Sequence, residues 1–116
     1  MGTRIVHDAA PVARAPSGRP LRHLVGNWIG AGLYVGEQWL LPGEAVPLHI
    51  HPVEEVLVFL GGEGVAILGE KEVAVGVGIT LHIPPGEPHG FRNTGAGELR
   101  LLVIFPMPEF AETGLV

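Results

Sequence analysis

Residues 43–62 read GEAVPLHIHPVEEVLVFLGG, and residues 78–93 read GITLHIPPGEPHGFRN. Both stretches join short apolar runs to glycine and proline, the residues that favour tight turns. Turns of this kind separate the apolar runs along most of the chain, which are residues 33–41, 55–60, 65–68, 72–75, 79–83, 89–93 and 99–105. No window of helical length has a 3.6-residue period free of Gly and Pro. The sequence therefore predicts an antiparallel all-β domain, with any helix confined to a terminal turn.

The composition is consistent with one folded domain. Of 116 residues, 18 are Gly and 11 are Pro, but 47% are hydrophobic and only 16% are charged. That apolar content is enough to offset the entropy of ordering a chain of this length around a single core. The longest apolar runs end far short of a membrane span, and the N-terminus lacks the apolar segment of a signal peptide. We therefore expect a cytoplasmic protein with no membrane partner.

The charged residues and the absence of cysteine narrow the kinds of site that the chain can form. The formal net charge is −5, and the seven Lys and Arg residues are scattered singly. This pattern lacks the basic stripe of a nucleic-acid-binding surface. With no Cys in the sequence, a thiolate zinc site and a nucleophilic thiol are excluded. Any metal must be bound by histidine and carboxylate side chains.

Four of the six histidines fall between positions 49 and 89, and two of them are separated by a single residue. Alternation along a strand places His49 and His51 on the same face, with Cα atoms about 6.6 Å apart. Two imidazoles at that spacing can reach one ion at about 2.1 Å each. His89 would add a third imidazole. Three imidazoles and a carboxylate would make a poor core without an ion, since unpaired buried polar groups are costly.

The carboxylate of this set is predicted to be Glu55. Four residues of straight strand would carry Glu55 roughly 13 Å beyond His51, too far to share an ion. Pro52 predicts a break in the strand, which allows the chain to fold back and bring Glu55 alongside the histidines. Glu54 points to the opposite face and is expected to be solvated. His7 and His23 are expected to be ordinary core or surface residues.

At these residues the sequence resembles the cupin family. The first cupin motif, G-x5-H-x-H-x3-E-x6-G, is filled by Gly43, His49, His51, Glu55 and Gly62. The second motif, G-x5-P-x-G-x2-H-x3-N, is filled by Gly78, Pro84, Gly86, His89 and Asn93. The resemblance implies a small, single-domain jelly-roll β-barrel, also called a double-stranded β-helix. It also implies one divalent metal bound by the residues that match the motif ligands, His49, His51, Glu55 and His89.

Three imidazoles and one carboxylate leave up to two positions open on an octahedral ion. Mn, Fe, Co, Ni and Zn all suit this set of donors, so the sequence does not name the ion. The expected partner is a small oxygenated molecule that coordinates the metal directly. The site could belong to an enzyme, either a dioxygenase or oxidoreductase or a redox-neutral isomerase or lyase. Alternatively, the metal of a non-catalytic binding or sensor protein could anchor a ligand or stabilise the barrel.

Further residues are candidates for a ligand pocket. Phe91 and Asn93 lie on the same strand face as His89, and Leu57 and Phe59 lie on the same face as Glu55, so all four are expected to face the interior. Leu57, Phe59 and Phe91 then either line a pocket or simply pack in the core. Gln38 could orient a substrate, although solvent exposure is the ordinary state of a glutamine. His82 is either an acid or base in the pocket or an exposed or interface residue. Arg92 and Arg100 could bind a carboxylate, or could form surface ion pairs.

The first residues of the chain show a different pattern. Residues 1–20 mix Ala, Pro, Arg and Gly without periodicity, which predicts a partly flexible or dimer-forming arm with at most one short strand, at residues 4–7. Residues 21–116 are predicted to form the barrel domain. Strand edges need protection, and similar small cupins often pair as dimers, so we expect a homodimer that uses part of residues 1–30.

Overall fold

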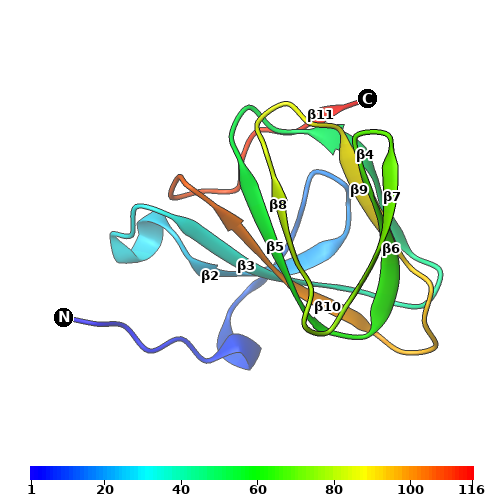
Figure 1. Cartoon of the computed structure of the whole chain (residues 1–116). Coiled ribbons are helices and arrows are strands. Elements are labelled where there is room, and N and C mark those ends of the chain that lie inside the picture. Colours follow the sequence, from blue (N-terminus) through cyan, green and yellow to red (C-terminus); the bar gives the residue numbers. More distant parts are fainter.

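The computed structural model describes residues 1–116 and contains eleven β-strands and two short 3-10 turns (Figure 1). In chain order, these elements are η1 (His7–Ala9), β1 (Val12–Arg14), β2 (Pro20–Val25), η2 (Asn27–Ile29), β3 (Tyr34–Leu40), β4 (Ala45–Ile50), β5 (Glu55–Gly61), β6 (Glu63–Leu68), β7 (Lys71–Gly76), β8 (Thr80–Ile83), β9 (His89–Asn93), β10 (Leu99–Phe105) and β11 (Gly114–Leu115). No helix in the chain is long and apolar enough to cross a membrane.

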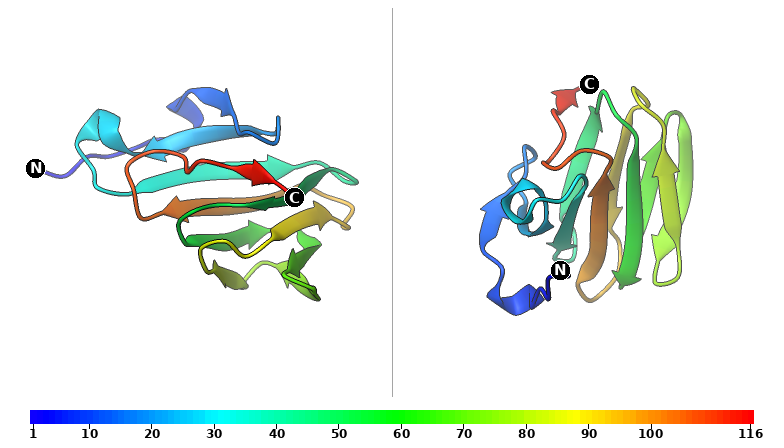
Figure 2. Two further views of the ribbon diagram at one scale, coloured as in Figure 1. Left: turned by 90° about the horizontal axis from the view of Figure 1, so that it is seen from above. Right: turned by 90° about the vertical axis from the view of Figure 1, so that its left-hand side faces the viewer.

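The strands form two sheets that face each other (Figure 2). One sheet has six strands in the order β1-β2-β3-β10-β5-β8, and the other has five in the order β11-β4-β9-β6-β7. Every strand pair is antiparallel, and successive strands repeatedly cross from one sheet to the other. The antiparallel all-β jelly roll predicted from the sequence is confirmed.

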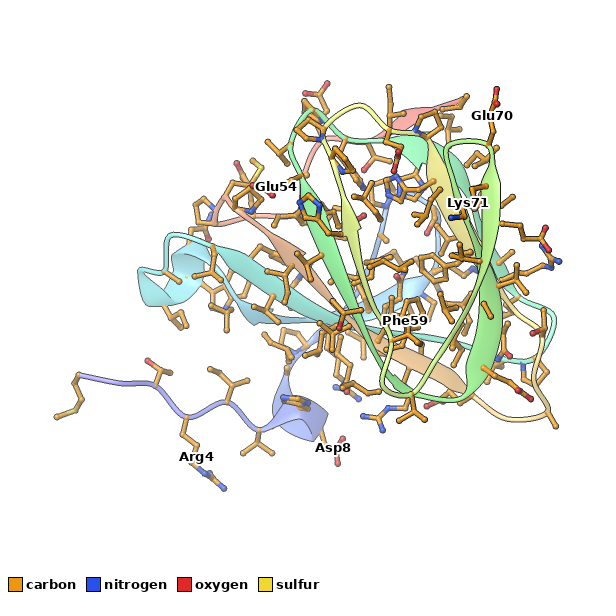
Figure 3. All side chains as sticks on the ribbon, viewed as in Figure 1. Arg4, Asp8, Glu54, Phe59, Glu70 and Lys71 are labelled. Carbon is orange, nitrogen blue, oxygen red and sulfur yellow. The ribbon has the colours of Figure 1, made fainter.

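The core lies between the two sheets and follows from alternation along the strands. In β5, Glu55, Leu57 and Phe59 are buried, whereas the residues between them are partly exposed. The inward residues of β10 meet those of β5 in register, with Val103 opposite Leu57. Figure 3 shows Phe59 among the side chains between the sheets, where its ring lies 6.0 Å from that of Phe91 on the opposite sheet. Packing of the two inner faces therefore fixes which residues line the interior.

The N-terminal residues differ from the prediction. A strand was expected at residues 4–7, but the structure places the short strand at Val12–Arg14, where it pairs with β2. The Arg22 side chain on β2 donates hydrogen bonds to the carbonyls of Asp8 and Ala10, so residues 8–10 are held against the sheet. The sequence patterns also missed β2 itself, the two-residue strand β11 and the internal turn η2.

Candidate metal centre

Four side chains predicted as metal ligands meet at one point between the sheets. Ligand atoms of His49, His51, Glu55 and His89 all lie within 4.8 Å of one another, and all four residues are buried. Two donors bound at about 2.1 Å to one ion are at most about 4.2 Å apart, so the cluster needs to contract by only a few tenths of an ångström. Side chains separated by up to 40 positions in the sequence are therefore already arranged around a space of ionic size.

A β-bulge in β4 turns the two motif histidines inward. Val46 is opposite Phe91 on β9, but the register then shifts by one residue, so that His49 is opposite His89. Without the shift, alternation from the buried Val46 would place Leu48 inside and His49 outside. Gly90 faces the bulge, where a Cβ atom would lie 2.8 Å from the Val46 carbonyl oxygen. A residue without a side chain therefore lets β9 approach the bulged strand.

Glu55 reaches the site from the opposite sheet. The chain leaves β4 at Ile50, turns through residues 51–54 and enters the six-stranded sheet at Glu55. A hydrogen bond of 2.9 Å from the Gly86 N–H to the His51 carbonyl joins this turn to the loop before His89. Glu54 is exposed and lies 2.8 Å from His82 Nε2 on the outer surface. The expected difference between the buried Glu55 and the solvated Glu54 is confirmed.

Backbone carbonyls orient all three imidazoles. His49 Nδ1 lies 2.8 Å from the Pro47 oxygen, His51 Nδ1 lies 2.9 Å from the Glu112 oxygen, and His89 Nδ1 lies 2.9 Å from the Glu87 oxygen. A carbonyl oxygen can only accept a hydrogen bond, so each Nδ1 carries a proton and donates it. In a neutral imidazole, the Nε2 lone pair is then free to bind a metal. This carbonyl support is typical of histidines that ligate metals.

One atom of the cluster is left without a partner. His51 Nε2 is buried and makes no hydrogen bond, although the Glu55 Oε1 atom lies 3.7 Å away. With the imidazole proton on Nδ1, the Nε2 lone pair faces an oxygen that is also an acceptor. Two acceptors facing each other in a buried site are unfavourable unless a cation lies between them. The residues present therefore fit a bound divalent metal ion.

The other contact of Glu55 is a charged hydrogen bond. His89 Nε2 lies 2.8 Å from Glu55 Oε1, and the carboxylate oxygen can only accept, so His89 is an imidazolium when both its nitrogens donate. Burial alone would lower the pKa of His89, but its hydrogen bonds with Glu55 and the Glu87 carbonyl, together with the negative charge of Glu55, raise that pKa above its usual value. By contrast, burial lowers the pKa of His49.

These shifts give a pH dependence for metal binding. An ion must displace the proton from His89 Nε2, so we expect metal affinity to rise with pH through the ordinary histidine range, about 6.5, and to level off only above it. The stability of the metal-free protein changes with pH in the opposite direction. The His89–Glu55 pair stabilises the fold at low pH, and this contribution is lost as pH rises through the raised pKa of His89. The increase in melting temperature on adding metal should therefore grow between pH 6 and 8. An increment that is constant or falls with pH would contradict this assignment.

The cluster opens into a pocket between the sheets. Three of the four residues line it, namely His49, His51 and Glu55. Of its fifteen lining residues, seven are hydrophobic and two more are prolines. The empty space within the pocket is about 30 Å³, room for one or two water molecules. Two segments near the chain ends form part of the wall, residues 15–17 after β1 and residues 110–115, which include β11.

The structure brings only some of the predicted pocket residues to the pocket. Leu57 and Phe91 line it. Gln38 also lines it and is only 4% exposed, so the expectation that this glutamine faces solvent is wrong. Its position on β3 explains this, because Gln38 lies on the same, inward face of the strand as the buried residues Tyr34, Gly36 and Leu40. Phe59 is buried in the core but does not reach the pocket wall.

Two other predicted pocket residues have different roles. His82 is exposed and pairs with Glu54 on the outer surface, because Leu81 and Ile83 occupy the inward positions of β8. Asn93 is buried, but its amide donates to the carbonyls of Leu40 and Gly97, and its oxygen accepts from the Gly95 N–H. Neither residue lines the pocket, and His82 has the exposed position that was the alternative expectation.

The candidate carboxylate-binding arginines also lie outside the pocket. Arg100 donates a 2.8 Å hydrogen bond to Glu37 on the outer face of the six-stranded sheet. An ion pair was the alternative expectation, but only the arginine is exposed, since Glu37 is buried. Arg92 is exposed. Among the wall residues that the sequence patterns missed, Val103 lies on an inward strand position that alternation could have found, whereas the bulge puts Val46 out of phase with His49 and His51. No periodic signal marks the two segments near the chain ends.

Comparison with known sequences gives partial matches. Auxin-binding protein 1 from Arabidopsis thaliana is 34% identical over 121 residues, which cover 92% of this chain and 61% of that protein. The oxalate-binding protein from Thermotoga maritima is 38% identical over 66 residues, which cover 56% of this chain and 54% of that protein. The chain thus spans less than two thirds of the length of either relative.

Solved structures resemble the chain over nearly its whole length. The polyketide cyclase RemF from Streptomyces resistomycificus superposes with a TM-score of 0.86 at 27% identity, covering 100% of this chain and 86% of that chain. A predicted oxalate decarboxylase from Thermotoga maritima gives a TM-score of 0.80 at 25% identity, covering 90% of this chain and 99% of that chain. The family model described as "Cupin domain" matches residues 36–105, more than half of the sequence. With its jelly roll and its His-His-Glu-His cluster, the chain belongs to the cupin family.

Proposed function

We propose that this cupin domain holds one divalent transition metal through His49, His51, Glu55 and His89, and that the metal binds a small oxygenated molecule by direct coordination. The observation that carries the proposal is the unpartnered His51 Nε2, which faces Glu55 at the wall of a largely apolar pocket. Imidazole nitrogens and a carboxylate suit Mn, Fe, Co, Ni or Zn. The pocket supplies apolar contacts, and the ion supplies the polar anchor.

The protein side chains have defined roles in this proposal. The carbonyls of Pro47, Glu112 and Glu87 hold the imidazoles with Nε2 directed inward, while Glu55 reduces the positive charge of the centre. When bound, the ion supplies either Lewis acidity or, if it is redox-active, electron transfer.

The lining favours ligand binding as the primary activity. It contains no Tyr, Lys, Arg or Cys, so the only groups there that can transfer a proton readily belong to the metal cluster. Turnover is the second candidate, because similar structures include the polyketide cyclase RemF and a predicted oxalate decarboxylase. Oxygen consumption by the iron-loaded protein would identify a dioxygenase or oxidoreductase, whereas product formation without oxygen would identify an isomerase or lyase.

Relaxation of water protons by the Mn²⁺-loaded protein tests the proposal directly. Metal bound with open positions should enhance water-proton relaxation, and a ligand that coordinates the ion should reduce that enhancement. We expect reduction by at least one member of a panel of oxalate, oxamate, benzoate and acetohydroxamate. Bound Mn²⁺ whose relaxation no member changes would show a structural metal, and absence of Mn²⁺ binding would reject the metal site itself.

We also propose that the chain forms a homodimer in which residues 1–30 take part. The outer face of the six-stranded sheet supports this, because it presents the partly exposed apolar side chains of Val35, Val56, Val58, Leu102 and Ile104. The first residues extend away from the barrel, and Arg4 on this stretch points away from it (Figure 3).

Sedimentation tests this pairing. We expect a dimer at micromolar concentration and a monomer for Val58→Lys, with Glu72→Lys on the other sheet as the control. A monomeric unmodified chain, or a dimeric Val58→Lys variant, would contradict pairing through this face.

A further inference from the structure

One amide in the pocket wall has no partner in the protein. Besides the metal cluster, the polar side chains that line the pocket are Ser17, Gln38 and Thr113. The Ser17 hydroxyl accepts a hydrogen bond from the Arg19 N–H, and the Thr113 hydroxyl donates to the Ala111 carbonyl. Gln38 is 4% exposed and makes no side-chain hydrogen bond to any residue. The amide keeps some access to the pocket space, where it is free to bind a ligand.

The wall also contains no positive side chain. Arg19 pairs with Glu44, Arg100 pairs with Glu37, and Arg22 donates to backbone carbonyls of residues 8 and 10, all outside the pocket lining. A divalent ion with one carboxylate and three neutral imidazoles has a formal charge of +1. One negative charge on a ligand neutralises that centre, whereas a second would remain unpaired in a largely apolar space.

The strand register separates Gln38 from the metal cluster. Gln38 is opposite Leu101 on β10, which is opposite Phe59 on β5. Phe59 follows Glu55 by four residues, about 13 Å along a strand. The positions between them are apolar, with Leu57 and Val103 in register on one sheet. On the other sheet Val46 and Phe91 are also in register, and both line the pocket. The pocket thus has a metal end, an apolar middle and an amide at the far end.

We propose that the pocket selects singly charged oxygen acids with an apolar body and a neutral hydrogen-bonding group at the end remote from the metal, and that Gln38 recognises that group. Dianions such as oxalate are disfavoured by the absence of a second positive charge. This assignment rests on the proposed metal function. Since the enclosed space holds only one or two water molecules, such a ligand enters by displacing residues 15–17 or 110–115, which adjoin the short edge strands β1 and β11.

Oxalate and oxamate provide a matched test of charge, because they are similar in shape and oxamate carries one negative charge fewer. Their affinities for the Mn²⁺-loaded protein are measured by water-proton relaxation and divided by their affinities for aqueous Mn²⁺. We expect this normalised ratio to favour oxamate by at least about tenfold. Gln38→Arg, which adds a positive charge to the wall, should move the ratio toward oxalate. Equal normalised affinities in the unmodified protein would overturn the charge selection.

A second pair tests the role of Gln38. 4-Acetylbenzoate and 4-isopropylbenzoate have similar shapes, but only the first carries an oxygen at the end remote from the carboxylate. We expect the unmodified protein to prefer 4-acetylbenzoate by about three- to tenfold, the effect of one hydrogen bond, and Gln38→Leu to abolish that preference. A preference that survives in Gln38→Leu, or that is absent from the unmodified protein, would overturn the assignment.

The measurements separate this inference from the function on which it rests. If the protein fails to bind Mn²⁺, or binds it with no ligand able to change the relaxation, the proposed function fails. If Mn²⁺ and ligands bind but neither matched pair is discriminated, only the selectivity fails. Mn²⁺ affinity measured in both Gln38 variants confirms that the substitutions leave the metal cluster intact, since Gln38 is not among its members.

Discussion

Replacement of His51 by alanine should lower the affinity for a divalent metal by at least about 100-fold. The substitution removes one of four converging donors, and changes to groups that only orient such donors already cost 10–100-fold. Competition with a chromophoric chelator measures the affinity. The substitution also removes the Nδ1 hydrogen bond to the Glu112 carbonyl, so urea denaturation of the metal-free variant is measured beside the affinity to check that the fold survives.

His82→Ala is the matched control for this experiment. His82 is also a histidine beside a glutamate, but its side chain is exposed and pairs with Glu54 on the outer surface. We expect the metal affinity of the His82→Ala variant to stay within about threefold of that of the unmodified protein. This change in affinity is smaller than the loss of one well-formed hydrogen bond at the site would cause. Similar losses in His51→Ala and His82→Ala would show that the metal binds elsewhere.

Asn93→Ala should reduce the free energy of unfolding by about 3 kcal/mol without removing the metal. The Asn93 side chain makes three hydrogen bonds, which join β9 to the carbonyls of Leu40 and Gly97 and to the N–H of Gly95. Each bond contributes about 1 kcal/mol, and loss of the amide leaves buried groups unsatisfied. Urea denaturation of the metal-free protein measures this loss.

Thr94→Ala tests whether the effect belongs to the Asn93 amide. Thr94 is the next residue and is exposed, so its replacement should change the free energy of unfolding by less than about 0.5 kcal/mol. Metal affinity should be unchanged within about threefold in both variants, since Asn93 stabilises the loops at the far end of β9 from His89. A large loss of metal affinity in Asn93→Ala, with little loss of stability, would instead place this residue at the metal site.

The sequence predicted the strands well because each apolar run is short and is ended by a turn. Each of the seven predicted runs overlaps an observed strand, namely β3 and β5 to β10. Alternation also predicted the buried faces of β5 and β9, since packing between two sheets imposes a period of two on the strands.

The bulge in β4 was beyond the reach of the alternation pattern. A two-residue period relates His49 to His51 but does not reveal that the phase changes between Val46 and His49. The change depends on how β4 pairs with β9, and on the missing side chain of Gly90. Gln38 shows a similar limit, because its residue type suggested exposure whereas its strand position determined burial.

The pocket wall was the least predictable part of the site. Residues 15–17 and 110–115 line it, yet they come from opposite ends of the sequence and carry no periodic pattern. Their positions depend on long-range contacts, such as the 2.9 Å hydrogen bond of His51 Nδ1 to the Glu112 carbonyl. The motifs thus predicted the metal cluster, whereas the shape of the ligand space depends on segments outside the motifs.

Anomalous scattering from crystals of the metal-loaded protein, recorded at the absorption edge of the added metal, tests the central claim most directly. We expect one peak per chain at about 2.0–2.2 Å from Nε2 of His49, His51 and His89 and from a carboxylate oxygen of Glu55. A peak at another group of residues, or no peak in crystals grown with excess metal, would contradict it.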